Sequence, residues 1–447
     1  MHRVHIRTYG CQMNERDSEG VGALLRSKGY VLVADEAEAD IILINTCSIR
    51  GLAEEKAIGK ADHLLRARRE GKGAKFIGIL GCMAQNRGAE LLERLPDLDL
   101  IVGTQRLRHI PDYLSQRLAS PTPAAYIDTA HEEGFEDALP GRDDGRQVSA
   151  FVSIQQGCDM KCAYCVVPKT RGPERSRSPE SILAEVRALA ESGTREVTLL
   201  GQIVNQYGRG RFRTEGGTSP FVRLLRSVAE VPGIERIRYT ACHPIGYRPD
   251  LVAAHAEIPQ LCAQVHLPFQ SGSDKILRAM GRPYLAERIR RLAAALRGAR
   301  QGMTLSTDVI VGFPGETDAD FALTEAMFSE IGFEQAFLFK YSMRPGTPAE
   351  PLGDTVPVDV KEARLFRLQE QLAMQSTTGN LRQVGTVQRV LVDGPNRKGG
   401  RLAGRTENER RVIFDGDLSL VGQFVDVNIT RAGETYLDGK LARTKPI

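Results

Sequence analysis

The sequence predicts an α/β protein of three units over residues 1–118, 148–375 and 376–447, with a linker over 119–147. Short apolar segments alternate with helical patterns up to about residue 375, and a stretch rich in proline and acidic residues interrupts them. Regular strand–helix alternation is typical of parallel sheets. A chain of 447 residues is long enough for about three domains at roughly 150 residues each.

The first unit is predicted to be a flavodoxin-like parallel sheet with helices on both faces. Strands are expected at 3–9, 40–45 and 75–80, with helical patterns at 14–28, 48–70 and 85–95. A cysteine follows each strand: Cys11, Cys47 and Cys82. Ligands bind at the carboxyl ends of strands in such sheets, so we expect these cysteines to converge on one edge. The alternative is three separate buried or reactive thiols.

The second unit is predicted to be an open, partial (β/α)6 version of the eight-fold α/β barrel. Six strands are expected at 151–155, 196–200, 235–240, 264–268, 305–311 and 336–341, separated by helical patterns such as 179–192, 286–300 and 318–331. Active sites of barrels lie at the carboxyl ends of the strands. Cys158, Cys162 and Cys165 directly follow the first of these strands, which places them at the predicted mouth.

The third unit is predicted to be a small β-barrel, an architecture often used to bind oligonucleotides. Five short strands are expected at 384–392, 401–405, 411–414, 424–430 and 435–442, with glycine-rich turns between them. From residue 376 onward, twelve Lys and Arg stand against eight Asp and Glu. This local excess of positive charge suits a nucleic-acid partner better than the net charge of +4 for the whole chain does.

Composition narrows the class of protein further. No run of about 18 apolar residues indicates a transmembrane helix, so no membrane partner is expected. The N-terminus enters a strand directly, without a charged and apolar leader, which predicts a cytoplasmic protein. In such a protein the eight cysteines indicate metal or catalytic sites rather than disulfides. Cys242 and Cys262 lie outside the two groups and are predicted to be buried hydrophobic residues.

The C-x3-C-x2-C motif of Cys158, Cys162 and Cys165 can hold three irons of a four-iron, four-sulfur cluster. The fourth iron then has no protein ligand and stays open for a substrate or cofactor. Zinc is the alternative, but a structural zinc site needs four ligands, and the sequence places no fourth Cys or His nearby.

At this point the chain resembles the radical S-adenosylmethionine (SAM) superfamily, in which this motif follows the first strand of a partial barrel. Further segments resemble its methylthiotransferase family: TYGCQMN at 8–14, NTCSIR at 45–50, GCMAQ at 81–85, QQGC at 155–158 and TRGPERSR at 170–177. The third unit resembles the TRAM domain of RNA-modifying enzymes. The resemblance covers residues 3 to 443 and therefore all three units.

The resemblance implies insertion of a methylthio group at C2 of N6-dimethylallyladenosine at position 37, in the tRNA anticodon loop. This C–H bond is not acidic enough for a side-chain base, so a cofactor must perform the difficult step. The implied cofactors are SAM and two [4Fe-4S] clusters. Cys158, Cys162 and Cys165 would hold the radical cluster, and the cluster on Cys11, Cys47 and Cys82 would carry the sulfur. A second SAM would methylate that sulfur.

Further site residues carry over from the resemblance. SAM contacts are expected from five residues at or after barrel strands, for which capping or a polar core position is the alternative: Gly201, Gln202, Gln270, Ser271 and Asp308. Phosphate contacts with RNA are expected from four basic residues that follow the cysteine loop: Lys169, Arg171, Arg175 and Arg177. A solvated charged surface is the alternative for these four.

Partners and rival functions complete the expectations. The enzyme would act as a monomer on tRNA and would need an electron donor protein and a sulfur donor. Within the family, the target can instead be threonylcarbamoyladenosine in tRNA or an aspartate of a ribosomal protein; the segments at 8–14 and 172–175 favour the dimethylallyladenosine target. A rival of another class is a metal-stabilised RNA-binding protein without catalysis.

Overall fold

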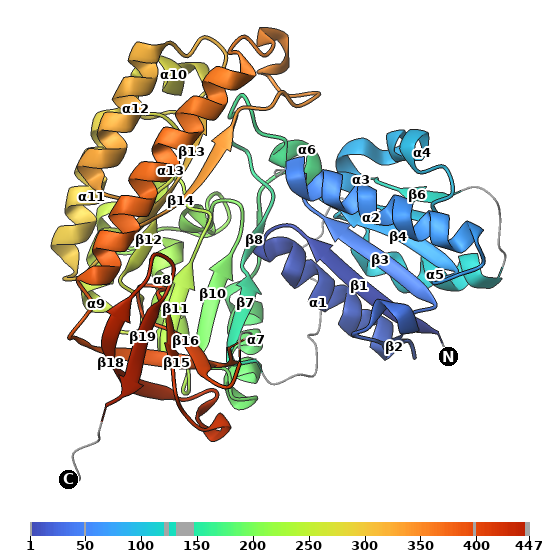
Figure 1. Cartoon of the computed structure of the whole chain (residues 1–447), viewed down its shortest axis with the longest axis horizontal. Helices are drawn as coiled ribbons and strands as arrows, with labels where there is room; N and C mark the ends of the chain where they lie inside the picture. Colours follow the sequence, from blue (N-terminus) through green and yellow to red (C-terminus); the bar gives the residue numbers. More distant parts are fainter. Residues whose placement is uncertain (1, 49–50, 120–124, 131–146, 397–398, 443–447) are drawn as a thin grey trace.

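The computed structural model describes residues 2–48, 51–119, 125–130, 147–396 and 399–442. The N-terminal sheet lies beside the central barrel, and the small C-terminal barrel lies at one end of the central barrel (Figure 1). This arrangement confirms the predicted fold class. In the described part of the chain, no helix is both long and apolar enough to cross a membrane.

The N-terminal sheet is parallel throughout and has the order β2-β1-β3-β4-β5-β6. Its first five strands follow the 2-1-3-4-5 order of flavodoxin-like folds. Helices α2, α3 and α4 cover one face and helices α1 and α5 the other, each over its own apolar core. The elements are β1 (Arg3–Tyr9), α1 (Gln12–Ser27), β2 (Val31–Leu32), β3 (Ile41–Thr46), α2 (Gly51–Arg69), β4 (Phe76–Gly81), α3 (Cys82–Arg87), α4 (Leu91–Arg94), β5 (Leu100–Val102), α5 (Ile110–Ala119) and β6 (Tyr126–Asp128).

Strand β6 corrects the prediction of a linker over 119–147. It pairs in parallel with β5 through Leu100–Tyr126, Ile101–Ile127 and Val102–Asp128. A three-residue strand beside prolines has no apolar period that sequence analysis can detect, but the open edge of β5 offers it hydrogen-bond partners. Most of the remaining predicted linker, residues 120–124 and 131–146, lies outside the described residues.

The central unit contains the six predicted strands, all parallel, in two triplets ordered β7-β10-β11 and β12-β13-β14. A bridge between Ile237 and Leu261 joins the triplets. The elements are β7 (Ser149–Ser153), β8 (Gln155–Gln156), α6 (Val167–Arg171), β9 (Arg175–Ser176), α7 (Pro179–Glu191), β10 (Glu196–Leu200), α8 (Pro220–Ala229), β11 (Arg236–Tyr239), α9 (Pro249–Glu257), β12 (Gln264–His266), α10 (Asp274–Ala279), α11 (Ala286–Ala299), β13 (Thr304–Val311), α12 (Asp318–Ile331) and β14 (Gln335–Lys340).

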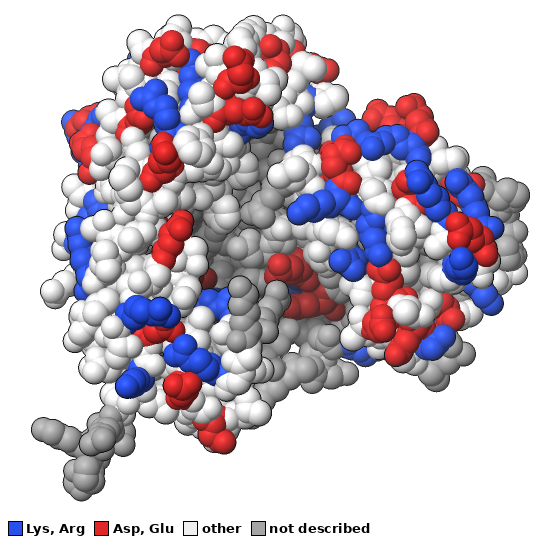
Figure 2. All heavy atoms as spheres, viewed as in Figure 1, with Lys and Arg blue, Asp and Glu red and all other residues white. Residues whose placement is uncertain are grey.

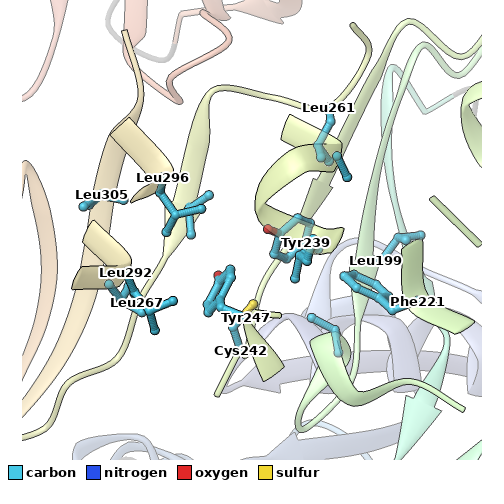
Figure 3. Close-up of a cluster of buried hydrophobic side chains, with 14 of the residues drawn as sticks. Leu199, Phe221, Tyr239, Cys242, Tyr247, Leu261, Leu267, Leu292, Leu296 and Leu305 are labelled. Atoms are coloured by element: carbon cyan, nitrogen blue, oxygen red, sulfur yellow. The ribbon is translucent and has the colours of Figure 1, made fainter. Parts of the chain in front are cut away.

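The core of this barrel fills the space between its strands and the surrounding helices. In Figure 3, Tyr239, Tyr247 and Cys242 lie close together among leucines that come from both strand triplets and α11. Cys242 and Cys262 are 5% and 2% exposed, so the prediction that both are buried hydrophobic residues is confirmed. Burial raises the pKa of each thiol to about 12.

The C-terminal unit is a closed five-stranded barrel, as predicted, with the order β15-β16-β17-β19-β18. Helix α13 (Val358–Leu381) leads into it and runs across the predicted boundary between residues 375 and 376. The strands are β15 (Val387–Pro395), β16 (Leu402–Arg405), β17 (Arg411–Phe414), β18 (Phe424–Ala432) and β19 (Leu437–Leu441).

The small barrel packs against the amino ends of the central strands, away from the cysteine loops. Arg236 at the start of β11 donates to the carbonyl oxygens of Arg405 and Arg389, at 2.8 and 2.6 Å. Several arginines of this unit pair here with carboxylates of the central unit, as in the ion pairs Arg389–Glu235, Arg405–Glu196 and Arg410–Glu334. The small barrel is therefore at the opposite end of the strands from the predicted mouth.

Candidate iron–sulfur and SAM site

A cavity of about 300 Å³ lies where the N-terminal sheet meets the mouth of the barrel. The recess between these two units is visible in Figure 2, with the barrel on the left and the N-terminal unit on the right. Both cysteine groups contribute to the cavity wall: Cys11, Cys47 and Cys82 from one unit, and Cys158, Cys162 and Cys165 from the other. Two groups that are far apart in the sequence therefore share one space.

The first three cysteines converge because they follow β1, β3 and β4, which are neighbours in the sheet. Two asparagines link the segments of Cys11 and Cys47: the side chain of Asn14 donates to that of Asn45 at 3.2 Å, and Asn45 donates back to the Asn14 carbonyl at 2.9 Å. Gly81, directly before Cys82, has φ 88° and ψ −150°, a backbone conformation almost restricted to glycine. An added Cβ would lie 2.2 Å from the side-chain oxygen of Asn45.

The surroundings of these thiols differ strongly. A hydrogen bond with Cys47, assisted by the charge of Arg171, lowers the pKa of Cys11 to about 6. Burial raises the pKa of Cys82 instead. Arg171 comes from α6 of the barrel unit, is 3% exposed, and pairs with Asp17 of α1 at 2.7 Å. One guanidinium therefore links the two units beside the first cysteine group.

The second group lies on a loop between β8 and α6. The backbone N–H of Cys158 donates to the carbonyl of Gly172 at 3.1 Å, and Gly157 before it has φ 77°. The side chain of Gln202 accepts from the Gly157 N–H at 2.6 Å. The buried guanidinium of Arg282 donates to the sulfur of Cys162 at 3.1 Å. These contacts hold the loop from several directions.

The donor set of each group suits an iron–sulfur cluster, because each offers three sulfur ligands and leaves one iron open. Burial raises the pKa of Cys158 to about 11 and that of Cys165 to about 12. Such thiols become thiolates when a bound metal displaces their protons. Within the ranges that the structure describes, no three His, Cys, Asp or Glu side chains are close enough together to hold a single metal ion.

Four of the five predicted SAM residues line the cavity: Gly201, Gln202, Gln270 and Asp308. Ser271 does not. It is fully buried, and its hydroxyl bonds with Thr324 and accepts from the backbone N–H of Ser273 at 3.2 Å. Ser271 therefore takes the polar core position that was its alternative. Gln270 has φ 69°, and its backbone bridges to β13.

The four basic residues predicted to contact RNA do not share one environment. Lys169 is exposed and Arg175 is half-buried. Arg171 and Arg177 are buried and paired with carboxylates, Arg171 with Asp17 and Arg177 with Glu185 at 2.6 Å. These carboxylates already occupy much of both guanidinium groups, although Arg171 also lines the cavity. Contact of Arg171 and Arg177 with RNA phosphates stays a prediction. A run of basic residues in the sequence does not reveal this pairing.

Sequence analysis missed several residues that line the cavity, above all Arg282 and His243. Burial lowers the pKa of His243 to about 3, assisted by the charges of Arg282 and Arg288. Its Nδ1 accepts from the backbone N–H of Ile245 at 3.2 Å. The only signal in the sequence was position, since His243 follows the third barrel strand at the predicted mouth.

Comparisons with known families agree with this division of the chain. Residues 3–103 match the Uncharacterized protein family UPF0004, residues 152–327 the Radical SAM superfamily, and residues 381–442 the TRAM domain. Fold and site together define a radical SAM enzyme with an added N-terminal sheet and a TRAM barrel.

Curated relatives narrow this class. The tRNA-2-methylthio-N(6)-dimethylallyladenosine synthase of Opitutus terrae is 51% identical over 99% of this chain and 98% of the relative. The enzyme of the same name from Akkermansia muciniphila is 44% identical over 96% of each. The chain belongs to the tRNA-2-methylthio-N(6)-dimethylallyladenosine synthase family of radical SAM methylthiotransferases, which confirms the predicted resemblance.

Solved structures support the fold alone. The radical SAM methyltransferase TsrM from Kitasatospora setae, with tryptophan and aza-SAM bound, has a TM-score of 0.56 over 78% of this chain and 75% of that chain, at 14% identity. The SAM radical enzyme OxsB has a TM-score of 0.55 over 83% of this chain and 56% of that chain, at 12% identity.

Proposed function

We propose that this enzyme inserts a methylthio group at C2 of N6-dimethylallyladenosine in the anticodon loop of tRNA. One observation carries the proposal: the two cysteine groups line the same cavity. Sulfur insertion requires that the hydrogen-abstracting group and the sulfur reach the same carbon, and a shared cavity meets this requirement. The names of the relatives give the substrate.

The residues present fit two [4Fe-4S] clusters. Cys158, Cys162 and Cys165 would hold the cluster that binds SAM, and Cys11, Cys47 and Cys82 would hold a second cluster that carries the sulfur. With SAM bound, the cluster on Cys158, Cys162 and Cys165 would supply the electron that cleaves SAM into methionine and a 5′-deoxyadenosyl radical, which is strong enough to remove hydrogen from an aromatic carbon.

The chain's own side chains position these groups. Gln202 fixes the backbone before Cys158, and Arg282 supports Cys162. Gly201 at the end of β10 leaves backbone groups open to SAM, and Asp308 faces the cavity beside His266, with which it bonds at 3.1 Å. We assign Gly201, Gln202, Gln270 and Asp308 to SAM binding.

The remaining partners follow from this chemistry. The reaction needs a one-electron donor protein, for which we propose an approach from the side of a separate cavity of about 560 Å³. The three cysteines of the radical loop also bound this cavity, together with Lys161, which suits an acidic partner. A sulfur donor must replace the sulfur that is used. We propose a monomer that acts on cytoplasmic tRNA, with Lys169 and Arg175 near the RNA.

Anaerobic reconstitution with iron and sulfide, followed by iron counting and mass spectrometry of tRNA nucleosides, tests the proposal. About eight irons per chain are expected for two four-iron clusters, together with methylthiolated dimethylallyladenosine. Product on threonylcarbamoyladenosine, or on an aspartate of a ribosomal protein, would reassign the substrate. Bound zinc without SAM cleavage would identify a non-catalytic RNA-binding protein and overturn the proposal.

A further inference from the structure

A second cavity lies beside the catalytic one, and no established role accounts for it. It has a volume of about 610 Å³, which is within the range of roughly 300–1,000 Å³ usual for ligand sites. The loop after β10, the start of α8 and the turn after β11 form its walls. Met160, between two cysteines of the radical loop, lines both cavities. The two cavities are therefore neighbours on either side of Met160.

The walls of this cavity combine an aromatic surface with positive charge. Phe212 is half-buried and its ring lies 5.7 Å from that of Tyr207. Arg209 and Arg248 line the cavity, and no aspartate or glutamate is among the described residues that line it. Arg209 is exposed and its guanidinium donates to the amide oxygen of Gln206 at 3.0 Å. Arg248 is 54% exposed and lies 3.8 Å from Asp250.

The loop that carries these groups is held in place by its own contacts. The N–H of Phe212 donates to the carbonyl of Gly208 at 2.8 Å. Gly208 has φ 77°, and an added Cβ would lie 2.6 Å from the Phe212 ring and 2.8 Å from Pro220. The hydroxyl of Tyr207 donates to the carbonyl of Arg177 at 2.6 Å. The aromatic surface is therefore fixed relative to the barrel mouth.

We propose that this cavity binds a nucleotide of the tRNA loop that neighbours the modified adenosine, with its base against Phe212 and its phosphate near Arg209 and Arg248. This proposal rests on the proposed function. Single-stranded RNA is bound through bases stacked on aromatic side chains and phosphates paired with arginine. The TRAM barrel is at the far end of the strands, so another surface must hold the nucleotides next to the target. The cavity shares Met160 with the catalytic one and carries the matching charge.

The experiment measures the affinity of the full-length enzyme for an RNA hairpin with the anticodon-loop sequence, by fluorescence anisotropy at several salt concentrations. Phe212→Ala should weaken binding about tenfold, since a stacked base is worth ~1–3 kcal/mol. Arg209→Ala should weaken binding and lower the slope of log affinity against log salt by about one. Phe366→Ala and Arg291→Ala, at exposed positions on α13 and α11, are the matched controls and should bind like the wild type.

Hairpins with one abasic loop position at a time then locate the stacked base. The loss caused by Phe212→Ala should disappear for one hairpin, whose missing base is next to the target adenosine. An equal loss with every hairpin, or no loss at all, overturns the proposal, provided that thermal unfolding and iron content show a folded variant. Failure of the proposed function is distinct, because the wild type would then neither bind the hairpin nor modify tRNA.

Discussion

The two cysteine groups reach the same cavity by opposite routes. Cys158, Cys162 and Cys165 lie within eight consecutive residues, and the loop after β8 alone brings them together. Cys11, Cys47 and Cys82 are spread over 72 residues and meet only because three parallel strands end at the same edge of a sheet. The site on Cys158, Cys162 and Cys165 depends on local backbone, whereas the site on Cys11, Cys47 and Cys82 depends on the fold of a whole domain.

Each group also has one buried arginine, and the two arginines differ in their partners. Arg171 beside the first group is neutralised by Asp17 at 2.7 Å, across the boundary between units. Arg282 donates to Cys162 and to the hydroxyl of Tyr284, and in the described part of the chain it forms no ion pair with Asp or Glu. A buried cation without a carboxylate needs another anion, and thiolate sulfur provides one. Arg171 thus connects the two units beside its cysteine group, whereas Arg282 donates directly to a cysteine sulfur.

Cysteine substitutions should have the largest effect of the changes considered, and they should distinguish the functions of the two cysteine groups. We expect Cys158→Ala to abolish 5′-deoxyadenosine formation, while Cys11→Ala retains SAM cleavage and loses methylthiolation. Each variant should keep about four of about eight irons, measured together with both products after anaerobic reconstitution. Cys262→Ala, at a buried cysteine outside both groups, is the control and should keep all irons. Release of 5′-deoxyadenosine by Cys158→Ala would reverse our assignment of the two groups.

Glycine substitutions test how far the first group depends on close backbone packing. In Gly81→Ala the new Cβ meets Asn45 at 2.2 Å, and the conformation itself costs ~1–3 kcal/mol. We expect loss of about four irons and of methylthiolation, with SAM cleavage retained. Gly29→Ala is the control, because its φ of 84° is similar but nothing lies within 4 Å of an added Cβ. It should cost about 1 kcal/mol in unfolding free energy and no iron. Equal iron loss in both variants would show that strain alone is responsible.

The contrast between cysteines that are close together in the sequence and cysteines that are far apart also explains how much of the site the sequence can predict. The spacing of Cys158, Cys162 and Cys165 is local, so the motif by itself identifies the site. The convergence of Cys11, Cys47 and Cys82 follows from the strand order and is predictable to that extent. The pairing of Arg171 with Asp17 joins residues 154 positions apart and has no local signal, which is why the sequence alone indicates an RNA-contacting surface position for Arg171.

The hydrogen bond between Ser271 and Thr324 and the short strand β6 escape prediction for a similar reason. Both are fixed by contacts with elements that are distant in the sequence. Gly201, Gln202, Gln270 and Asp308 can be placed on the cavity because they lie at the ends of strands that the apolar pattern locates. Prediction therefore reaches the strand ends and the cysteines, but not the side chains that pair across units.

The ion pair between Asp17 and Arg171 should be a strong structural connection between the two units. Asp17→Asn leaves a buried, unpaired guanidinium, which typically costs ~3–5 kcal/mol. We expect a loss of that order in the free energy of unfolding of the N-terminal unit. The denaturant-induced unfolding transition of this unit measures the loss. Less methylthiolated product per 5′-deoxyadenosine is also expected, because the two cysteine groups lose their alignment. Asp62→Asn removes the exposed pair with Arg66 and should change stability by at most ~0.5 kcal/mol; an equal effect would exclude a connecting role for Asp17.

Removal of the charge on Arg282 should have the smallest of these effects. The expected effect is a shift in the reduction potential of the radical cluster. Reduction adds negative charge, so a buried guanidinium that donates to Cys162 stabilises the reduced form. A hydrogen bond to a charged group is worth ~1.5 kcal/mol, which corresponds to roughly 65 mV for one electron. We expect Arg282→Gln to lower the midpoint potential by up to this amount and Arg282→Lys to restore part of it. A redox titration monitored by EPR in a Cys11→Ala background observes this cluster alone. If the potential of Arg282→Gln is unchanged, Arg282 has only a packing role in the cysteine loop.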